Sequence, residues 1–214
     1  MRPGPGQRRP EPSGEEPPQL DVARLLEALD RHGAQYIVVG GAGARGHGAT
    51  RDTVDLDCVV RQDRENLDNV AAALRDLGAF LRVGGMSDEE ARRLPVQVDA
   101  RTLEGFTTWR TLAGDVDIIA DIPRREGGRI GYEELARHAL VVNVKDYGRR
   151  LVIAALDDII ASKEGADRPK DREALPELYA LRDRQLGATG TAPEAGGPPS
   201  GPVQEGREED RNEN

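Results

Sequence analysis

Residues 36–60 read YIVVGGAGARGHGATRDTVDLDCVV, with two apolar segments on either side of a glycine-rich turn. The apolar run 36–39 predicts a short buried strand, because the pair of glycines directly after it ends the run. Residues 54–60 predict a second strand, whose side chains alternate between its two faces. One of these faces is uniformly apolar and is expected to belong to the core: Val54, Leu56, Cys58 and Val60.

The other face of this second strand carries two acidic side chains, Asp55 and Asp57. Neighbouring carboxylates repel each other unless a cation compensates them, and hard divalent cations such as Mg²⁺ (or Mn²⁺) bind carboxylate oxygens. The pair therefore predicts a metal site. The alternative is a strand end at which both aspartates are simply solvated.

A later apolar strand, residues 115–120, repeats the pattern with Asp117 between Val116 and Ile118. If it pairs beside the first acidic strand, Asp117 adds a third carboxylate, and three carboxylates can hold two metal ions. Asp115 follows a glycine and is expected only to begin the strand. Asp117 is therefore the third predicted metal ligand.

The glycine-rich turn contains a literal G-x-G-x-x-G at Gly41, Gly43 and Gly46, which is also the pattern of dinucleotide-binding folds. Such a fold needs a helix with an apolar face after the glycines. Residues 44–52 hold no large apolar side chain, so only a short helical turn and a loop are expected. A dinucleotide-binding oxidoreductase is therefore the weaker alternative.

Outward from this stretch, helical and strand periodicity alternate, which predicts an α/β (α+β) domain. The expected folding unit is residues 20–186, between disordered tails at 1–19 and 187–214, the second of them acidic. Helices are expected at about 20–33, 63–77, 155–166 and 170–184. Further strands are expected at about 79–83, 95–100, 115–120, 139–144 and 149–153.

The composition sets limits on function. The 214 residues have a formal net charge of −9, which excludes a wholly basic nucleic-acid binder but leaves local basic patches possible. No apolar run approaches the roughly 18–20 residues that cross a bilayer, and the N-terminus lacks the apolar segment of a secretory signal. The single cysteine, Cys58, has no partner for an internal disulfide. A soluble, cytoplasmic protein without a membrane partner is expected.

The two closing helices each place a charge beside apolar residues. Lys163 follows Leu156 and Ile160 at helical spacing, so it lies at the edge of the buried stripe and needs an anion or a path to solvent. Asp171 has a similar place in the last helix. Two interpretations stay open: an ion pair where the helices meet, or a lysine that binds a ligand.

These motifs, in this order, resemble the nucleotidyltransferase (polymerase-beta-like) superfamily. Its pattern h-G-[GS]…[DE]-h-[DE]-h…h-[DE]-h is matched by Val39-Gly40-Gly41, Asp55-Leu56-Asp57-Cys58 and Val116-Asp117-Ile118. The details Gly41-Ala42…His47-Gly48…Arg51…Thr53…Asp55 look most similar to the AbiEii-like branch, which includes toxins of toxin–antitoxin pairs. The resemblance covers about residues 20–184.

The resemblance implies a minimal domain, a mixed sheet flanked by helices with a helical C-terminal part, that moves an NMP from an NTP to an acceptor hydroxyl. The acceptor, whether RNA, protein or small molecule, is left open, and a cognate antitoxin is an implied partner. Asp55, Asp57 and Asp117 would hold Mg²⁺ (or Mn²⁺) and carry catalysis. The first alternative is a non-catalytic descendant that binds nucleotide or a partner protein.

The remaining site residues come from the same resemblance. Gly40 and Gly41 would let the backbone approach the triphosphate, although the serine frequent at the second position, and its hydroxyl contact, are missing. Lys163 would hold triphosphate oxygens, with Lys170 as a helper. The other roles are open: Asp171 orients Lys163 or accepts a proton, Arg51 reaches a phosphate or braces Asp55, His47 contacts nucleotide or caps its turn, and Trp109 is core or stacks on a base.

Overall fold

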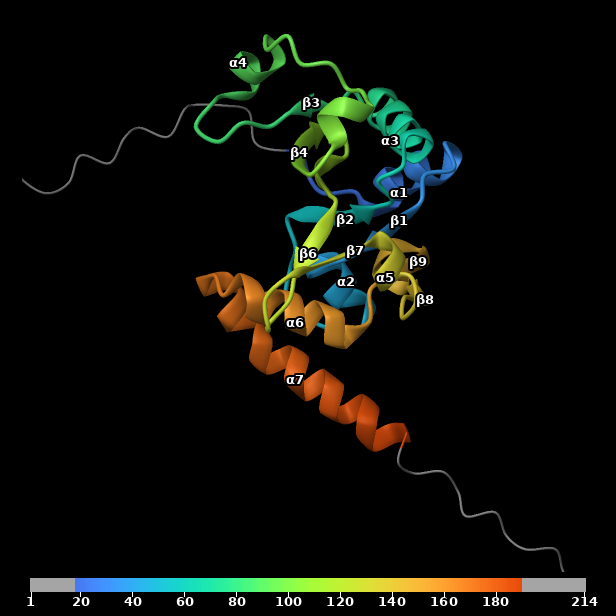
Figure 1. Cartoon of the computed structure of the whole chain (residues 1–214), viewed down its shortest axis with the longest axis vertical. Helices are drawn as coiled ribbons and strands as arrows, with labels where there is room; N and C mark the ends of the chain where they lie inside the picture. Colours follow the sequence, from blue (N-terminus) through green and yellow to red (C-terminus); the bar gives the residue numbers. More distant parts are fainter. Residues whose placement is uncertain (1–17, 190–214) are drawn as a thin grey trace, which may run out of the picture.

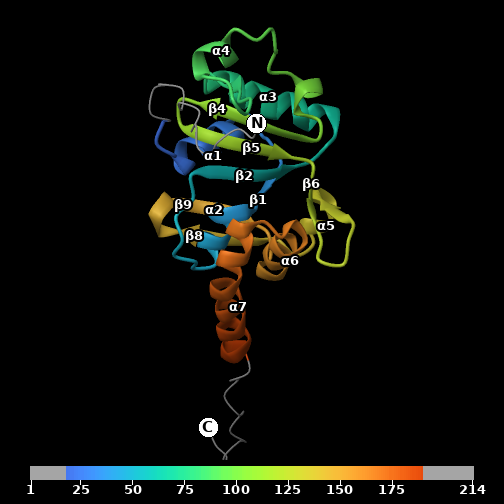
Figure 2. The same ribbon diagram turned by 90° about the vertical axis from the view of Figure 1, so that its left-hand side faces the viewer.

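The computed structural model describes residues 18–189, which form a seven-stranded mixed sheet with helices around it (Figure 1). Its strands are β1 (Tyr36–Val38), β2 (Asp55–Val60), β3 (Phe80–Leu81), β4 (Phe106–Thr111), β5 (Gly114–Ile119), β8 (Leu140–Val144) and β9 (Arg149–Ile153). They lie in the order β3-β4-β5-β2-β1-β9-β8, and most of them are stacked one above another in Figure 2. Strands β6 (Asp121–Pro123) and β7 (Arg129–Gly131) form a separate hairpin.

The helices are α1 (Val22–Arg31), α2 (Gly40–Gly46), α3 (Arg64–Asp76), α4 (Asp88–Arg92), α5 (Tyr132–Leu135), α6 (Leu156–Ala166) and α7 (Pro169–Thr189). Side chains that precede two of them satisfy first-turn amides, since Asp21 accepts from Arg24 N and Asp63 from Asn66 N. The predicted fold class is confirmed: a mixed sheet flanked by helices, with a helical C-terminal part. Helix α7 runs three residues past the expected boundary at 186, and residues 1–17 and 190–214 of the expected tails lie outside the described residues.

Two apolar cores form, one on each face of the sheet. On one face, α1 and α3 pack against the inward side chains of β2 and β5, including Leu56, Cys58 and Ile118, all 0% exposed. On the other face, α5, α6, α7 and the β6–β7 hairpin surround a second core that contains Val59 and Ile119. Because β2 alternates, the second face is also the one to which its aspartates belong.

The topology does not fit the dinucleotide-binding alternative. That fold requires a parallel β-α-β unit around its glycine turn. Here β2 returns antiparallel to β1, with Val38 opposite Cys58, and α2 between them is only seven residues long. The glycine turn therefore makes a short helix and a reversal of the chain, as the absence of large apolar residues predicts.

Two expectations about strands were wrong. Residues 95–100 form no strand: Pro95 has no amide to pair, and Asp99 instead accepts from Thr102 N to begin a short 3₁₀ turn, Ala100–Leu103. The strand beside β5 is instead β4, which the sequence analysis missed; it lies between β3 and β5 and pairs with β5 through a tight turn that ends at Gly114. Val54, expected in the core, is 81% exposed and precedes the first residue of β2.

None of the helices within residues 18–189 has the length and apolar character needed to cross a membrane.

The β4–β5 ladder brings an arginine onto Asp115. Arg110 lies opposite Asp115 in the register, and its Nε is 2.7 Å from Asp115 Oδ1. Arg110 Nη1 also lies 2.9 Å from Asp88 Oδ2, which joins α4 to the sheet. Both Arg110 and Asp115 are buried, so this cluster depends on mutual compensation of charge.

We expect Arg110→Met to lower the free energy of unfolding by about 3–5 kcal/mol, because it leaves Asp115 buried without its closest cation. Urea denaturation measures the change. Arg93→Met is the matched control, since Arg93 pairs with Glu89 on an exposed helix surface and should matter far less. Equal stability of the two variants would contradict a structural role for the Arg110–Asp115 pair.

Candidate functional site: a carboxylate-lined cavity facing two lysines

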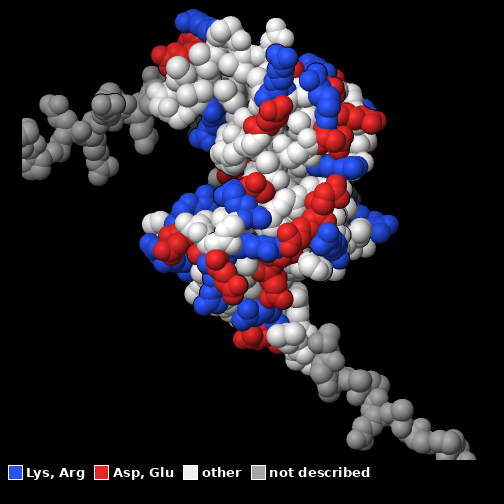
Figure 3. All heavy atoms as spheres, viewed as in Figure 1, with Lys and Arg blue, Asp and Glu red and all other residues white. Residues whose placement is uncertain are grey.

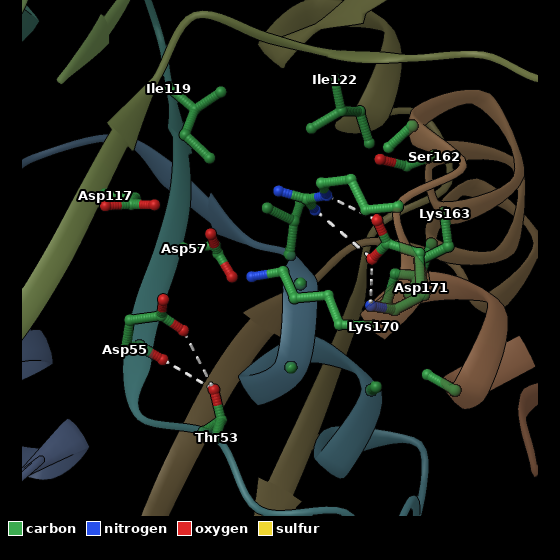
Figure 4. A pocket seen from close by; sticks show the side chains of 18 of the residues that line it. Thr53, Asp55, Asp57, Asp117, Ile119, Ile122, Ser162, Lys163, Lys170 and Asp171 are labelled. Carbon is green, nitrogen blue, oxygen red and sulfur yellow. Dashed lines mark hydrogen bonds and ion pairs between the residues drawn. The ribbon is translucent and has the colours of Figure 1, made fainter. Parts of the chain in front are cut away.

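A cavity of about 600 Å³ lies between the acidic face of the sheet and the last two helices. On the face shown in Figure 3, the surface is hollowed between the part that carries α3 and α4 and the part that carries α6 and α7. Acidic side chains lie inside this hollow, and Lys and Arg side chains gather beside it. In the close view, Asp55, Asp57 and Asp117 stand on the strand side, whereas Lys163 and Lys170 come from the helix side (Figure 4).

Parallel pairing of β2 with β5 brings the predicted carboxylates together. Asp57 lies directly opposite Asp117 in the register, and Asp55 lies opposite Asp115. Neighbouring strands are about 4.8 Å apart, so residues in register on one face have adjacent side chains. The structure thus places Asp55, Asp57 and Asp117 on one wall of the cavity, as the alternation in the two strands predicts.

The fourth aspartate on this face, Asp115, is separated from the others by its partners. Arg110 and Arg82 both pair with it, Arg82 through Nη1 at 3.0 Å from Oδ2. Within residues 18–189, no Lys, Arg or His forms an ion pair with Asp55, Asp57 or Asp117. Asp115 is therefore neutralised inside the fold, and the charge of the other three is left for a ligand to compensate.

The pKa values of Asp57 and Asp117 reflect this lack of compensation. Burial raises the pKa of Asp57 to about 7, and the charges of Asp55 and Asp117 add to that effect, while Lys170 and Lys163 oppose it. Burial also raises the pKa of Asp117, although a hydrogen bond with Thr108 works against the rise. One oxygen of Asp117, Oδ1, is buried without a hydrogen-bond partner. A buried acceptor without a partner costs free energy that a bound cation would recover.

The chemistry of this donor set fits a divalent cation. Oxygen donors on adjacent strands, an orphaned carboxylate oxygen and a strongly raised pKa all indicate a missing positive charge. Among the described residues, however, no three His, Cys, Asp or Glu side chains already form a ready-made metal cluster. The metal assignment therefore stays a prediction.

Gly40 makes room for the central carboxylate. A Cβ on Gly40 would lie 1.8 Å from Asp57 Oδ2, and the residue has a φ of +57°, which side-chain-bearing residues rarely adopt. Val39 N also donates to Asp57 O at 2.9 Å, which continues the β1–β2 ladder to the edge of the turn. Gly40 and Gly41 both line the cavity, and a larger residue at position 40 would displace the Asp57 carboxylate.

Lys163 forms the ion pair that the sequence left as one of two interpretations. Its Nζ lies 3.3 Å from Asp171 Oδ1, and Asp171 is fully buried where α6 meets α7. Arg168, which the sequence analysis missed, holds the other oxygen of Asp171 at 2.6 Å. The only available signal for Arg168 was its place three residues before Asp171 at the start of a helix.

Asp171 is poorly suited to accept a proton. Burial by itself would raise its pKa, but the hydrogen bond from Arg168 and the charges of Lys163 and Arg168 outweigh burial, so the pKa is lowered. The geometry therefore favours the orienting role for Asp171 over the proton-accepting one.

Lys170 is aimed into the cavity. Its side chain points from α7 toward Asp57 in Figure 4, and its charge lowers the pKa of both Asp57 and Asp117. In the part of the chain that the structure describes, Lys170 has no ion-pair partner within 4.0 Å. The sequence ranked Lys163 first and Lys170 as its helper, whereas the structure gives Lys170 the more open position.

The other candidates have partners within the fold. Arg51 lines the cavity and pairs with Glu173 of α7 at 2.8 Å, so it does not brace Asp55, and a contact with phosphate stays a prediction. His47 Nε2 lies 2.8 Å from the carbonyl of Ala154 and therefore donates to it, and burial lowers its pKa. Trp109 is 0% exposed and belongs to the core, and burial raises the pKa of Cys58, which is inert packing.

Comparison with known proteins adds little to this geometry. No protein-family model matches the chain, and no curated protein matches it. Among solved structures, the chain is similar to "a putative nucleotidyltransferase" from Thermotoga maritima, with a TM-score of 0.41 and 11% sequence identity. The match covers 78% of this chain and 88% of that protein. This similarity is too distant to indicate what the chain does.

The raised pKa of Asp57 predicts how stability depends on pH. The folded state binds this proton more tightly than the unfolded state, because the pKa is about 7 in one and near the ordinary 3.8 in the other. In metal-free buffer, the contribution of Asp57 to the free energy of unfolding should therefore fall as pH rises from about 4 to about 7, and stay level above that.

The comparison of wild type with Asp57→Asn isolates this effect, because the other titrating groups are common to both proteins. Urea denaturation at a series of pH values in the presence of a chelator should show that Asp57→Asn gains stability relative to wild type as pH rises. Parallel pH profiles for the two proteins would mean that the folded state does not raise the pKa of Asp57.

Proposed function

We propose that this protein is a nucleotidyltransferase that moves a nucleoside monophosphate from an NTP to an acceptor hydroxyl and releases pyrophosphate, with Mg²⁺ or Mn²⁺ as its cofactor. The observation that carries this proposal is the uncompensated set of Asp55, Asp57 and Asp117 on two paired strands. The cavity before them is within the 300–1,000 Å³ that small-molecule sites span.

The residues divide the work between metal and phosphate binding. Asp55, Asp57 and Asp117 would hold the divalent ions, which when bound neutralise phosphate oxygens and lower the pKa of the acceptor hydroxyl. Because burial raises the pKa of Asp117, this carboxylate is also suited to take the acceptor's proton. Gly40 and Gly41 keep this wall of the cavity clear of side chains.

On the helix side, Lys170 supplies the cation that is free to meet the triphosphate. Lys163 lies in the same cavity but shares Asp171 with Arg168. It can therefore bind a phosphate only by giving up its ion pair with Asp171. Asp171 then acts as the orienting group for two cations. Such an arrangement holds positive charge near the site before any ligand is present.

The acceptor and the biological setting are further parts of the proposal. RNA, protein and small-molecule hydroxyls are all compatible with the cavity as described. A place in the AbiEii-like toxin branch, with a cognate antitoxin as partner, rests on the sequence details between Gly41 and Asp55. A descendant that binds nucleotide without turnover is the second candidate, because the lysine–aspartate pairing leaves one of the two lysines engaged.

The primary test is transfer from α-³²P-labelled NTPs to total RNA and total protein. We expect Asp57→Asn to abolish labelling of any acceptor while the protein stays folded, because the substitution removes a central metal ligand and relieves carboxylate repulsion. Asp76→Asn is the control, since Asp76 pairs with His32 on the far surface of α1 and α3.

Full transfer by Asp57→Asn would refute the metal assignment. Saturable binding of an NTP by the wild type, with no transfer to any acceptor class, would instead favour the non-catalytic descendant.

The two lysines should separate in their effects. We expect Lys170→Met to lower NTP affinity by a factor that corresponds to about 1.5–3 kcal/mol, with little change in melting temperature, because it removes a cation without an ion-pair partner. Unlike Lys170→Met, Lys163→Met should lower the free energy of unfolding, by about 3 kcal/mol, because it weakens the compensation of buried Asp171.

Isothermal titration with Mg²⁺-NTP and thermal melting measure both effects. Adding Asp171→Asn to Lys163→Met should restore most of the lost stability. If Lys163→Met melts like the wild type and loses NTP binding while Lys170→Met keeps it, the roles assigned to the two lysines are reversed.

A further inference from the structure

Thr53 lies at the point where the loop after α2 turns into β2, two residues before Asp55. Its Oγ1 is 2.9 Å from the backbone oxygen of Asp55 and 3.4 Å from Asp55 Oδ1 (Figure 4). A hydroxyl has one hydrogen to donate, so it can hold either oxygen after a small rotation. Within residues 18–189, Thr53 is the side chain that hydrogen bonds to Asp55.

The same hydroxyl fills the space above Gly41. A Cβ on Gly41 would lie 2.6 Å from Thr53 Oγ1 and 2.9 Å from Thr53 Cβ, closer than real Cβ atoms approach other groups. Gly41 does not have a positive φ, so its backbone could accept a side chain. The reason for glycine at this position is therefore Thr53. By contrast, Gly40 has a positive φ as well as Asp57 against it.

Gly41, Thr53 and Asp55 consequently form one unit at the edge of the cavity, and all three line it. Packing against Gly41 would be served as well by valine, which has the shape of threonine. The hydroxyl is needed for its two contacts with Asp55, the shorter to the backbone oxygen and the longer to the carboxylate. The carboxylate otherwise has neither an ion pair nor another side-chain donor in the described residues. A carboxylate with several rotamers requires such a contact to keep one orientation.

We propose that Thr53 is a positioning residue, which holds the Asp55 carboxylate in the orientation needed to bind a divalent cation, while Gly41 leaves the space in which the threonine side chain sits. This inference rests on the proposed function, in which Asp55 is a metal ligand. Partners that orient metal ligands typically contribute 10- to 100-fold to metal affinity or activity.

The first test measures Mn²⁺ dissociation constants and melting temperatures for Thr53→Val and Thr53→Ser. Thr53→Val keeps the shape and deletes the hydroxyl, so the Mn²⁺ dissociation constant should rise about 10- to 100-fold. The melting temperature should fall no more than in Thr111→Val, because each variant loses one hydrogen bond to a backbone oxygen. Thr53→Ser should recover most of the affinity. Thr111→Val is the matched control, because Thr111 bonds to Gly114 O in the β4–β5 turn: it should lower the melting temperature without changing Mn²⁺ binding.

The second test exchanges the hydroxyl between the two positions. Gly41→Ser alone should lower the melting temperature, because the new side chain collides with Thr53. Adding Thr53→Ala removes the collision and returns a hydroxyl to the same space, so the double variant should regain stability and bind Mn²⁺ more tightly than Thr53→Ala alone. A double variant as unstable as Gly41→Ser would overturn the pairing of Thr53 with Gly41.

Asp55→Asn separates failure of this inference from failure of the proposed function. If Asp55→Asn weakens Mn²⁺ binding and Thr53→Val does not, Thr53 does not position Asp55. If Asp55→Asn leaves both Mn²⁺ binding and transfer intact, the metal assignment fails, and a melting cycle of Thr53→Val with Asp55→Asn then decides the inference. Non-additive shifts in that cycle support the Thr53–Asp55 contact, and additive shifts overturn it.

Discussion

The parallel pairing of β2 with β5 is the contact on which the site depends. It sets Asp57 opposite Asp117 and Asp55 opposite Asp115 on one face of the sheet, and so concentrates negative charge in a partly dry place. Such an arrangement costs stability unless something compensates it. The fold compensates Asp115 with Arg110 and leaves the other three aspartates facing a cavity. Asp115 is therefore part of a structural charge cluster, whereas Asp55, Asp57 and Asp117 form the candidate site.

The cations near the cavity are divided in the same way. Lys163 and Arg168 compensate a buried aspartate and stabilise the junction of α6 and α7, whereas Lys170 reaches toward the carboxylates across the cavity. Removing either cation from Asp171 would leave a buried charge less well compensated, whereas Lys170 has no such partner among the described residues. The junction of the two helices therefore supports the wall from which Lys170 extends.

The positions of the aspartates and the fold class could be predicted from the sequence, because both depend on local periodicity. Strand alternation placed Asp55 and Asp57 on one face, and apolar flanks marked Asp117. Alternating helical and strand periodicity predicted an α/β domain, whereas the mixed sheet was implied by the family resemblance. The strand expected at 95–100 was wrong and strand β4 was missed. A short stretch of sequence does not show whether it will pair with a neighbouring strand, so both errors concern pairing. The core position of Val54 failed for a similar reason, because β2 begins one residue later.

What the sequence established, then, is which residues share a face, because alternation and helical spacing are properties of a few consecutive residues. Pairing between distant segments required the folded chain. The sequence separated Asp115 from Asp117 by the glycine before it, but only the β4–β5 register shows that Arg110 pairs with Asp115. Lys163 and Lys170 likewise differ only because α6 and α7 cross at Asp171. Partners in such pairs are set by three-dimensional packing, which no local pattern encodes.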